Sequence, residues 1–205
     1  MLLCSLNGIS SVNATDYQEE KHYVKVNGLA ADGAEVREYF SFYCPHCYSY
    51  EPLMASVKKH LPDGAKFVKN HVDFLPGASH KMQQMLTKAL ITAQVLDVEE
   101  SQVAAMFKYI HVHRAVFTSQ RDVRNVFVLN GIDGDEFDRV MASEEVLNKA
   151  KIMHDHQDAI SKSGGITSVP AVIINGKYRL IAKELDKENI EQEYNNLVKY
   201  LLTLD

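Results

Sequence analysis

The first third of the chain alternates short apolar runs with turn residues. Residues 23–26 and 36–42 are rich in β-branched and aromatic side chains and predict two strands. A helix is expected over residues 44–60, because Pro45 suits the first helical position. Residues 65–74 predict a third strand. The expected order is therefore strand, strand, helix, strand.

The middle of the chain follows a different period. Between residues 77 and 163, apolar side chains recur every three or four positions, which is the spacing of amphipathic helices. The first of these helices carries its apolar face at Met82, Met85, Leu86, Ala89, Leu90, Ala93 and Leu96. Further helices are predicted over residues 103–110, 123–127, 137–141 and 145–162.

Strands return near the C-terminus. Residues 171–174 and 178–181 predict two strands, and Asn175-Gly176 between them is a strong signal for a tight hairpin. An amphipathic helix over residues 190–202 follows.

The strands on either side of the helical region need each other to complete one sheet. We therefore expect one α/β domain made of residues 15–76 and 164–205, with residues 77–163 as a helical insertion.

The composition of the 205-residue chain excludes several classes of protein. Apolar residues make up 46%, enough for a globular core, which argues against global disorder. A formal net charge of −5 argues against a dedicated nucleic-acid binder, which normally has a basic excess. Three cysteines are too few for a scaffold held by disulfides. No stretch approaches the roughly 18 uncharged apolar residues of a membrane-spanning helix.

The N-terminal segment differs from the rest of the chain in charge. Residues 1–14 contain no Lys, Arg, Asp or Glu, and they end on small residues that are typical of a signal-peptide cleavage site. We expect them to form a partial secretory signal that lacks the usual basic start; the alternative is an N-terminal extension that stays attached. Cleavage after Ala14 would remove Cys4 and leave Cys44 and Cys47.

These two cysteines form the motif Cys44-Pro45-His46-Cys47. Such spacing suits half of a zinc site, a pair of buried thiols or a redox-active disulfide. Zinc needs four ligands, and the other candidate histidines are spaced i, i+2, which points them to different sides of a helix. They are His111/His113 and His154/His156. The redox interpretation is therefore favoured over a metal site.

The start of a helix is a position that activates Cys44. Backbone N–H groups of the first turn point at its sulfur, and the helix dipole favours negative charge there, so the thiolate is stabilised. His46, when protonated, adds a positive charge beside it. A stabilised thiolate favours the reduced form and makes the disulfide a strong oxidant. Cys47 lies one turn inside the helix, where we expect it to be more buried and to act as the resolving partner.

Residues 40–48, FSFYCPHCY, resemble the active-site segment of the DsbA family of periplasmic thiol:disulfide oxidoreductases. Residues 69–74 are similar to the strand that follows in that family, and residues 168–171 and 175–178 to its cis-proline loop and hairpin. The resemblance extends over residues 17–200, with the helical insertion included. It implies a thioredoxin-like fold, in which a central mixed sheet is flanked by helices and carries an inserted all-helical subdomain.

The resemblance also implies a cis peptide bond between Val169 and Pro170, facing the cysteines. The backbone groups of Val169 would then be free to pair with an extended substrate, as in β-strand addition. We therefore expect Val169 and Pro170 to bind substrate. Without the resemblance, an ordinary trans proline at the start of a strand would be expected.

Three charged residues are candidates for modulating the cysteines. Glu38 is in phase with the apolar residues of its predicted strand, so its carboxylate points to an apolar face and needs a partner. The family resemblance pairs it with Lys69 beneath the active site; the alternative is a purely structural ion pair. Glu51 lies four residues after Cys47 on about the same helix face. It is a candidate modulating group, and the alternative is a solvated surface glutamate.

Together these features predict a protein disulfide oxidoreductase that donates its Cys44–Cys47 disulfide to newly exported proteins through a mixed disulfide at Cys44. The resemblance implies re-oxidation by a DsbB-like, quinone-linked membrane protein. We expect a monomer in the periplasm of a Gram-negative bacterium. Its expected partners are cysteine-containing exported proteins, with no nucleic acid and no metal or organic cofactor.

Two other functions are alternatives. The first is a disulfide isomerase or reductase, although isomerases of this kind usually add a dimerisation domain for which the chain has no room. The second is a peptide-binding chaperone in which the redox chemistry is incidental. The intact C-P-H-C motif makes the chaperone the weaker of the two.

Overall fold

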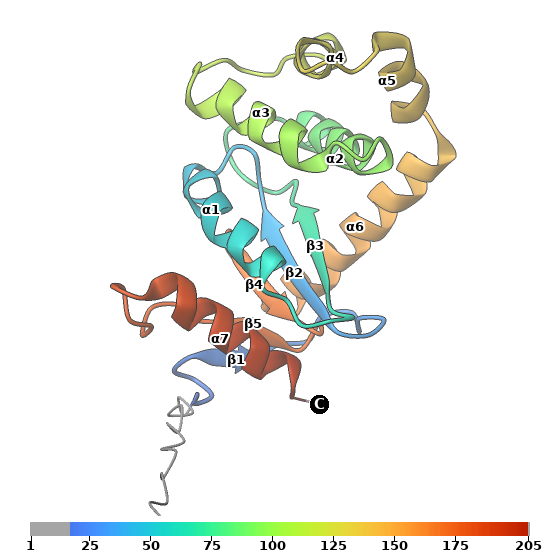
Figure 1. Cartoon of the computed structure of the whole chain (residues 1–205). Helices are drawn as coiled ribbons and strands as arrows, with labels where there is room; N and C mark the ends of the chain where they lie inside the picture. Colours follow the sequence, from blue (N-terminus) through green and yellow to red (C-terminus); the bar gives the residue numbers. More distant parts are fainter. Residues whose placement is uncertain (1–16, 205) are drawn as a thin grey trace, which may run out of the picture.

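A mixed sheet of five strands forms the centre of the computed structural model, which describes residues 17–204 (Figure 1). The strands are β1 (Tyr23–Lys25), β2 (Glu35–Phe40), β3 (Lys66–His71), β4 (Ala171–Ile174) and β5 (Tyr178–Leu180). Their order across the sheet is β1-β5-β4-β2-β3. β2 and β3 are parallel, and the other neighbours are antiparallel. The predicted export signal, residues 1–14 with Cys4, lies outside the described residues.

Two helices cover one face of the sheet. They are α1 (Pro45–Lys59), which connects β2 to β3, and α7 (Ile190–Leu202), near the C-terminus (Figure 1). Their apolar sides share one buried cluster with the strands. The cluster includes Met54, Val57, Leu197 and Val198 from the helices and Val36, Val172 and Ile174 from the sheet.

Five helices lie between β3 and β4, and we call them the helical block. They are α2 (His80–Val95), α3 (Glu99–His111), α4 (Gln120–Leu129), α5 (Gly134–Met141) and α6 (Glu144–Lys162). Figure 1 shows α2 to α5 above one end of the sheet, with α6 leading back toward it. Apolar residues of the block, of the end of β2, of the segment after it and of the start of α1 form a single cluster. It includes Phe40, Phe42, Cys44, Cys47, Leu86, Phe107 and Phe127. The cysteines therefore lie where the sheet and the helical block meet.

The far end of α6 packs on the other face of the sheet. Ile160 shares a buried cluster with Tyr39 and Ile173. A polar contact adds to this packing, because the Gln157 side-chain amide donates to Asp73 Oδ1 at 2.6 Å and its carbonyl accepts from the Asp73 backbone N–H at 2.8 Å. Helices thus cover both faces of the sheet. The candidate site for chemistry is therefore the junction between the end of β2 and the start of α1.

Four strands end earlier than the sequence predicts: β1 and β5 by one residue, and β2 and β3 by two and three residues. β2 stops at Phe40, because Ser41 begins a turn in which its carbonyl oxygen accepts from the Cys44 N–H at 3.0 Å. β3 stops at His71. The predicted helices and the hairpin are confirmed, and residues 175 and 176 have φ angles of 53° and 70°, as a two-residue hairpin turn requires. Among the described residues, no helix is long and apolar enough to cross a membrane.

We predict that Gly176→Ala destabilises the fold more than Gly33→Ala. Both glycines have positive φ, 70° and 92°, so alanine at either site carries a left-handed backbone cost of about 1–2 kcal/mol. A Cβ at Gly176 would also meet the backbone carbonyl of Leu29, whereas a Cβ at Gly33 meets nothing within 4 Å. Urea unfolding of both variants measures the difference. Equal losses of unfolding free energy would contradict the importance of this close approach.

Candidate active site

Cys44 is the N-cap residue of α1. Its backbone is extended, with φ −94° and ψ 111°, and Pro45 is the first residue of the helix. The Cys44 sulfur accepts a hydrogen bond from the backbone N–H of Cys47, with an N–Sγ distance of 3.2 Å. A sulfur in this position meets both the unpaired N–H groups and the positive end of the helix dipole, which favour its thiolate. The structure thus places Cys44 where the sequence predicts it.

The two cysteines differ in burial. Cys44 is 5% exposed and Cys47 is fully buried, and both are free thiols. Pro45 and His46, which lie between them, are exposed. Burial, together with the hydrogen bond to Cys44, raises the pKa of Cys47. Of the two cysteines, only Cys44 thus keeps any exposed surface.

The loop before β4 closes the site from the other side. The Val169–Pro170 peptide bond is cis, as the family resemblance implies. The Cys44 thiol donates a hydrogen bond to the Val169 carbonyl oxygen, with an Sγ–O distance of 3.5 Å. These segments are distant in the chain and meet because β4 pairs with β2. In this reduced form, the Val169 carbonyl is thus occupied by Cys44, whereas the sequence led us to expect it free.

The three predicted modulating charges come together in the structure. Glu38 and Lys69 are direct neighbours across the β2–β3 pair. The Lys69 ammonium lies 2.6 Å from Glu38 Oε2 and 2.8 Å from Glu51 Oε1. Glu51, for which a solvated surface glutamate is the alternative, keeps contact with solvent but is also paired, because its position on α1 turns it toward the end of the Lys69 side chain.

The charges in this cluster do not balance. Glu38 is fully buried, and its second oxygen, Oε1, has no hydrogen-bond partner within residues 17–204. Burial raises the pKa of Glu38, and the ammonium of Lys69 offsets only part of that shift. For Lys69, burial acts to lower the pKa, but the two carboxylates outweigh it and raise the pKa overall. Lys69 therefore stays charged, and Glu38 is the carboxyl that holds a proton more readily than usual.

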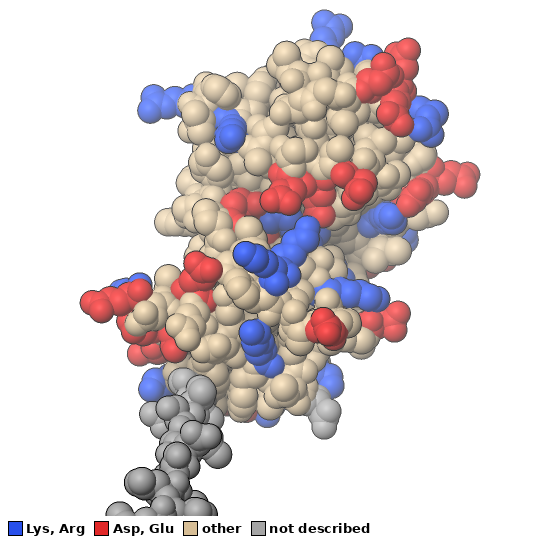
Figure 2. Space-filling model, in the orientation of Figure 1, with Lys and Arg blue, Asp and Glu red and all other residues tan. Residues whose placement is uncertain are grey.

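Solvent reaches this cluster through a groove between α1 and α3. Glu51 and Lys69 line the groove together with apolar residues and with further charged groups. These are Met54, Ala55, Phe67 and Val103, and Lys58, Lys59, Glu99 and Glu100. Figure 2 shows acidic side chains across the middle of this face, above a group of basic ones. The cluster is thus sealed at Glu38 and open to water at Glu51, whose side chain is 26% exposed.

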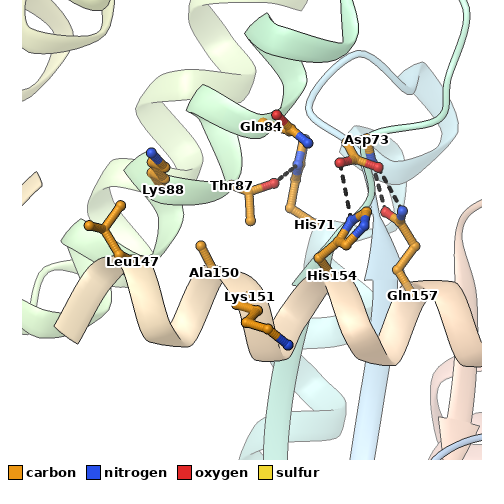
Figure 3. A pocket seen from close by; sticks show the side chains of 10 residues that line it. All are labelled: His71, Asp73, Gln84, Thr87, Lys88, Leu147, Ala150, Lys151, His154 and Gln157. Carbon is orange, nitrogen blue, oxygen red and sulfur yellow. Dashed lines mark hydrogen bonds and ion pairs between the residues drawn. The ribbon is translucent and has the colours of Figure 1, made fainter. Parts of the chain in front are cut away.

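Another pocket lies between α2 and α6, and Figure 3 shows the side chains that line it. His71 lines it and stacks on Phe42 with ring centroids 5.1 Å apart. Burial lowers the pKa of His71 to about 3, so its ring is neutral, and its Nδ1 lies 2.9 Å from Thr87 Oγ1. His71 therefore supports the apolar segment before the cysteines. Within the described part of the chain, no three His, Cys, Asp or Glu side chains are placed to hold a metal ion.

His111, the last residue of α3, also contacts this segment. Its Nε2 lies 2.8 Å from the Phe42 carbonyl oxygen. No local sequence pattern could reveal this contact, because the two residues are 69 positions apart and meet through the packing of the helical block.

Comparison with known proteins extends these observations. Residues 35–195 match the family model of the DSBA-like thioredoxin domain. The thiol:disulfide interchange protein DsbA of Escherichia coli is 34% identical over 197 residues, which cover 93% of this chain and 91% of that protein. The DsbA of Yersinia pestis is 34% identical over 199 residues, covering 94% of this chain and 92% of that protein.

Solved structures agree with the sequence match. The disulfide oxidoreductase DsbA from Proteus mirabilis has a TM-score of 0.79 and 30% identity, covering 92% of this chain and 98% of that one. The DsbA from Klebsiella pneumoniae has a TM-score of 0.78 and 25% identity, covering 93% of this chain and all of that one (100%). Because the matches extend over both the sheet and the helical block, the chain belongs to the DsbA-like thioredoxin-domain family and is a thiol:disulfide oxidoreductase.

Proposed function

We propose that the protein oxidises cysteine pairs in exported proteins by donating the Cys44–Cys47 disulfide. A substrate thiolate attacks Cys44 Sγ, the Cys44–Cys47 bond breaks, and the Cys47 sulfur leaves with the electron pair and takes up a proton. A second substrate thiolate then attacks the substrate sulfur of the mixed disulfide and releases the Cys44 thiolate. The substrate loses two electrons, and the Cys44–Cys47 pair gains them.

One observation carries this proposal: the backbone N–H of Cys47 donates to the Cys44 sulfur at the start of α1. The released Cys44 thiolate is stabilised there, whereas burial raises the pKa of Cys47. Both effects favour the product of the forward reaction, a thiolate at Cys44 and a protonated Cys47. A couple that prefers its reduced form is an oxidant toward its substrates. His46 is exposed two residues after Cys44, and a protonated ring there would add to the effect.

The substrate chain is proposed to bind along the loop before β4. The Val169 carbonyl accepts from the Cys44 thiol in the reduced protein, and formation of the disulfide would remove that donor. The carbonyl would then be open to a substrate backbone N–H, as in β-strand addition. Proteus mirabilis DsbA has been solved with a non-covalently bound peptide, PWATCDS, which contains a cysteine. Val169 and Pro170 are the corresponding candidates here.

Membership of the family supports a proposal for the compartment and the partners. The related DsbA proteins come from Gram-negative bacteria. We propose a periplasmic monomer in which residues 1–14 direct export, residues 77–163 are the inserted subdomain, and a DsbB-like quinone-linked membrane protein restores the disulfide. A partner of this kind is required because each turnover leaves both cysteines reduced.

We predict that Cys44→Ser abolishes oxidation of a dithiol peptide, because the sulfur that forms the mixed disulfide is missing. Cys47→Ser, incubated with a substrate that already holds a disulfide, should instead accumulate mixed disulfides, because the Cys44 thiolate attacks that disulfide and no Cys47 thiol is left to displace the substrate from Cys44. Peptide oxidation assays and non-reducing gels measure the two outcomes. Oxidase activity retained by the Cys44→Ser protein would refute the proposed function.

We also propose that Glu38, Lys69 and Glu51 modulate the site, because the charge of Glu38 acts to raise the pKa of Cys47. Glu38→Gln should flatten the pH dependence of stability between about pH 5 and pH 8. Burial raises the pKa of Glu38, so as the pH rises above the ordinary pKa of a glutamate the folded state holds on average more protons at this group than the unfolded state does. The unfolding free energy of the native sequence therefore falls as pH rises, and glutamine removes that loss.

Urea unfolding of the reduced proteins at both pH values tests this prediction. Glu188→Gln, the same substitution at an exposed position, is the matched control and should keep the native pH dependence. Identical pH dependence in the native and Glu38→Gln proteins would show that Glu38 ionises as an ordinary glutamate does.

A further inference from the structure

His111 makes a hydrogen bond to the chain just before the active-site cysteine. Its Nε2 lies 2.8 Å from the carbonyl oxygen of Phe42, two residues before Cys44. A carbonyl oxygen only accepts, so the imidazole must donate through Nε2–H. The helical block thus supplies a side-chain donor to the segment that delivers Cys44 to the start of α1.

The orientation of the His111 ring is fixed by aromatic neighbours. It lies parallel to the Tyr48 ring, with an interplanar angle of 9° and centroids 5.3 Å apart, and it is tilted against Phe107 at 6.0 Å. Tyr48 stands on the first turn of α1, and its backbone N–H donates to the Cys44 carbonyl at 3.1 Å. The ring of His111 is therefore held between its own helix and the helix that carries the cysteines.

The peptide group between Phe42 and Tyr43 is held at both ends. His111 donates to its carbonyl, and its N–H donates to Ser41 Oγ at 3.2 Å. The next N–H, that of Cys44, donates to the Ser41 carbonyl at 3.0 Å. These bonds set the path of the chain from the end of β2 to Cys44, and so they set the direction from which the sulfur meets the first-turn N–H groups.

We propose that His111 is a positioning residue for the redox reaction, which acts on Cys44 through the Phe42 carbonyl. It holds the turn in the shape that keeps the Cys44 sulfur at the N-cap. Its N–H also offsets the partial negative charge of a carbonyl oxygen that lies close in the chain to the thiolate. The role depends on the proposed function of Cys44, and it couples the helical block to the redox site.

Two variants separate the hydrogen bond from the ring stack. His111→Gln keeps a donor at about the reach of Nε2 and loses the stack on Tyr48. His111→Phe keeps an aromatic ring and loses the donor. His113→Phe is the matched control, because His113 lies two residues further along the chain and is exposed.

The test has two readouts in each protein. The first is the titration of the Cys44 thiol in the reduced protein, followed by thiolate absorbance with the Cys44→Ser protein as background. The second is the equilibrium constant for exchange with glutathione. Thermal unfolding is recorded alongside, because a purely structural role would change stability alone.

His111→Phe should move the titration of Cys44 to higher pH and make its disulfide less oxidising. The equilibrium constant for exchange with glutathione should change by about three- to tenfold, which corresponds to the net free energy of one hydrogen bond. His111→Gln should show a clearly smaller change, and His113→Phe should match the native protein. Lower thermal stability without a change in either readout would overturn the proposal, as would equal shifts in the Gln and Phe variants. Failure of the proposed function is read separately, from oxidase activity retained in the Cys44→Ser protein.

Discussion

The hydrogen bond from the Cys47 amide to the Cys44 sulfur is the interaction on which the site depends. It forms because Pro45 starts α1 directly after Cys44, which leaves the N–H groups of the first turn without helical partners. The sheet brings Val169 to the same sulfur from the opposite side. The helical block covers the adjoining apolar surface, so that Cys47 is shielded from water. Every layer of the fold thus contributes to one asymmetric pair of sulfurs.

In the proposed mechanism, this asymmetry gives the reaction its direction. Negative charge is favoured at Cys44 and disfavoured at Cys47, whose pKa is raised by burial. The nearby cluster of Glu38, Lys69 and Glu51 adds two carboxyls against one ammonium. An excess carboxyl in a buried place is costly to ionise, which explains why the pKa of Glu38 is raised although it contacts a lysine. The buried charges therefore include one carboxyl, that of Glu38, which holds a proton more readily than usual.

The features that the sequence predicted well are local. The helix start at Cys44-Pro45 and the hairpin at residues 175–176 each depend on a few adjacent residues. The partnership of Glu38 with Lys69 combined strand phase with the family resemblance, and the parallel pairing of β2 with β3 confirms it. The cis bond before Pro170 came from the resemblance alone.

The features that the sequence did not reveal depend on packing between distant segments. Glu51 joins the charge cluster because the packing of α1 places it beside Lys69 of β3, a relation that helical spacing on α1 cannot express. The contact of His111 with Phe42 requires the position of α3 over the end of β2. β2 ends early because of the turn at Ser41, although the apolar pattern continues through Phe42 into the shared core.

The equilibrium between the Cys44–Cys47 disulfide and glutathione measures the central claim most directly, because it compares the stability of the reduced and oxidised forms. We predict a couple that is more oxidising than glutathione, so that glutathione at low excess reduces it almost completely. An equilibrium constant close to that of reducing thioredoxins would contradict the account. It would mean that the start of α1 does not stabilise the Cys44 thiolate enough to make this protein an oxidase.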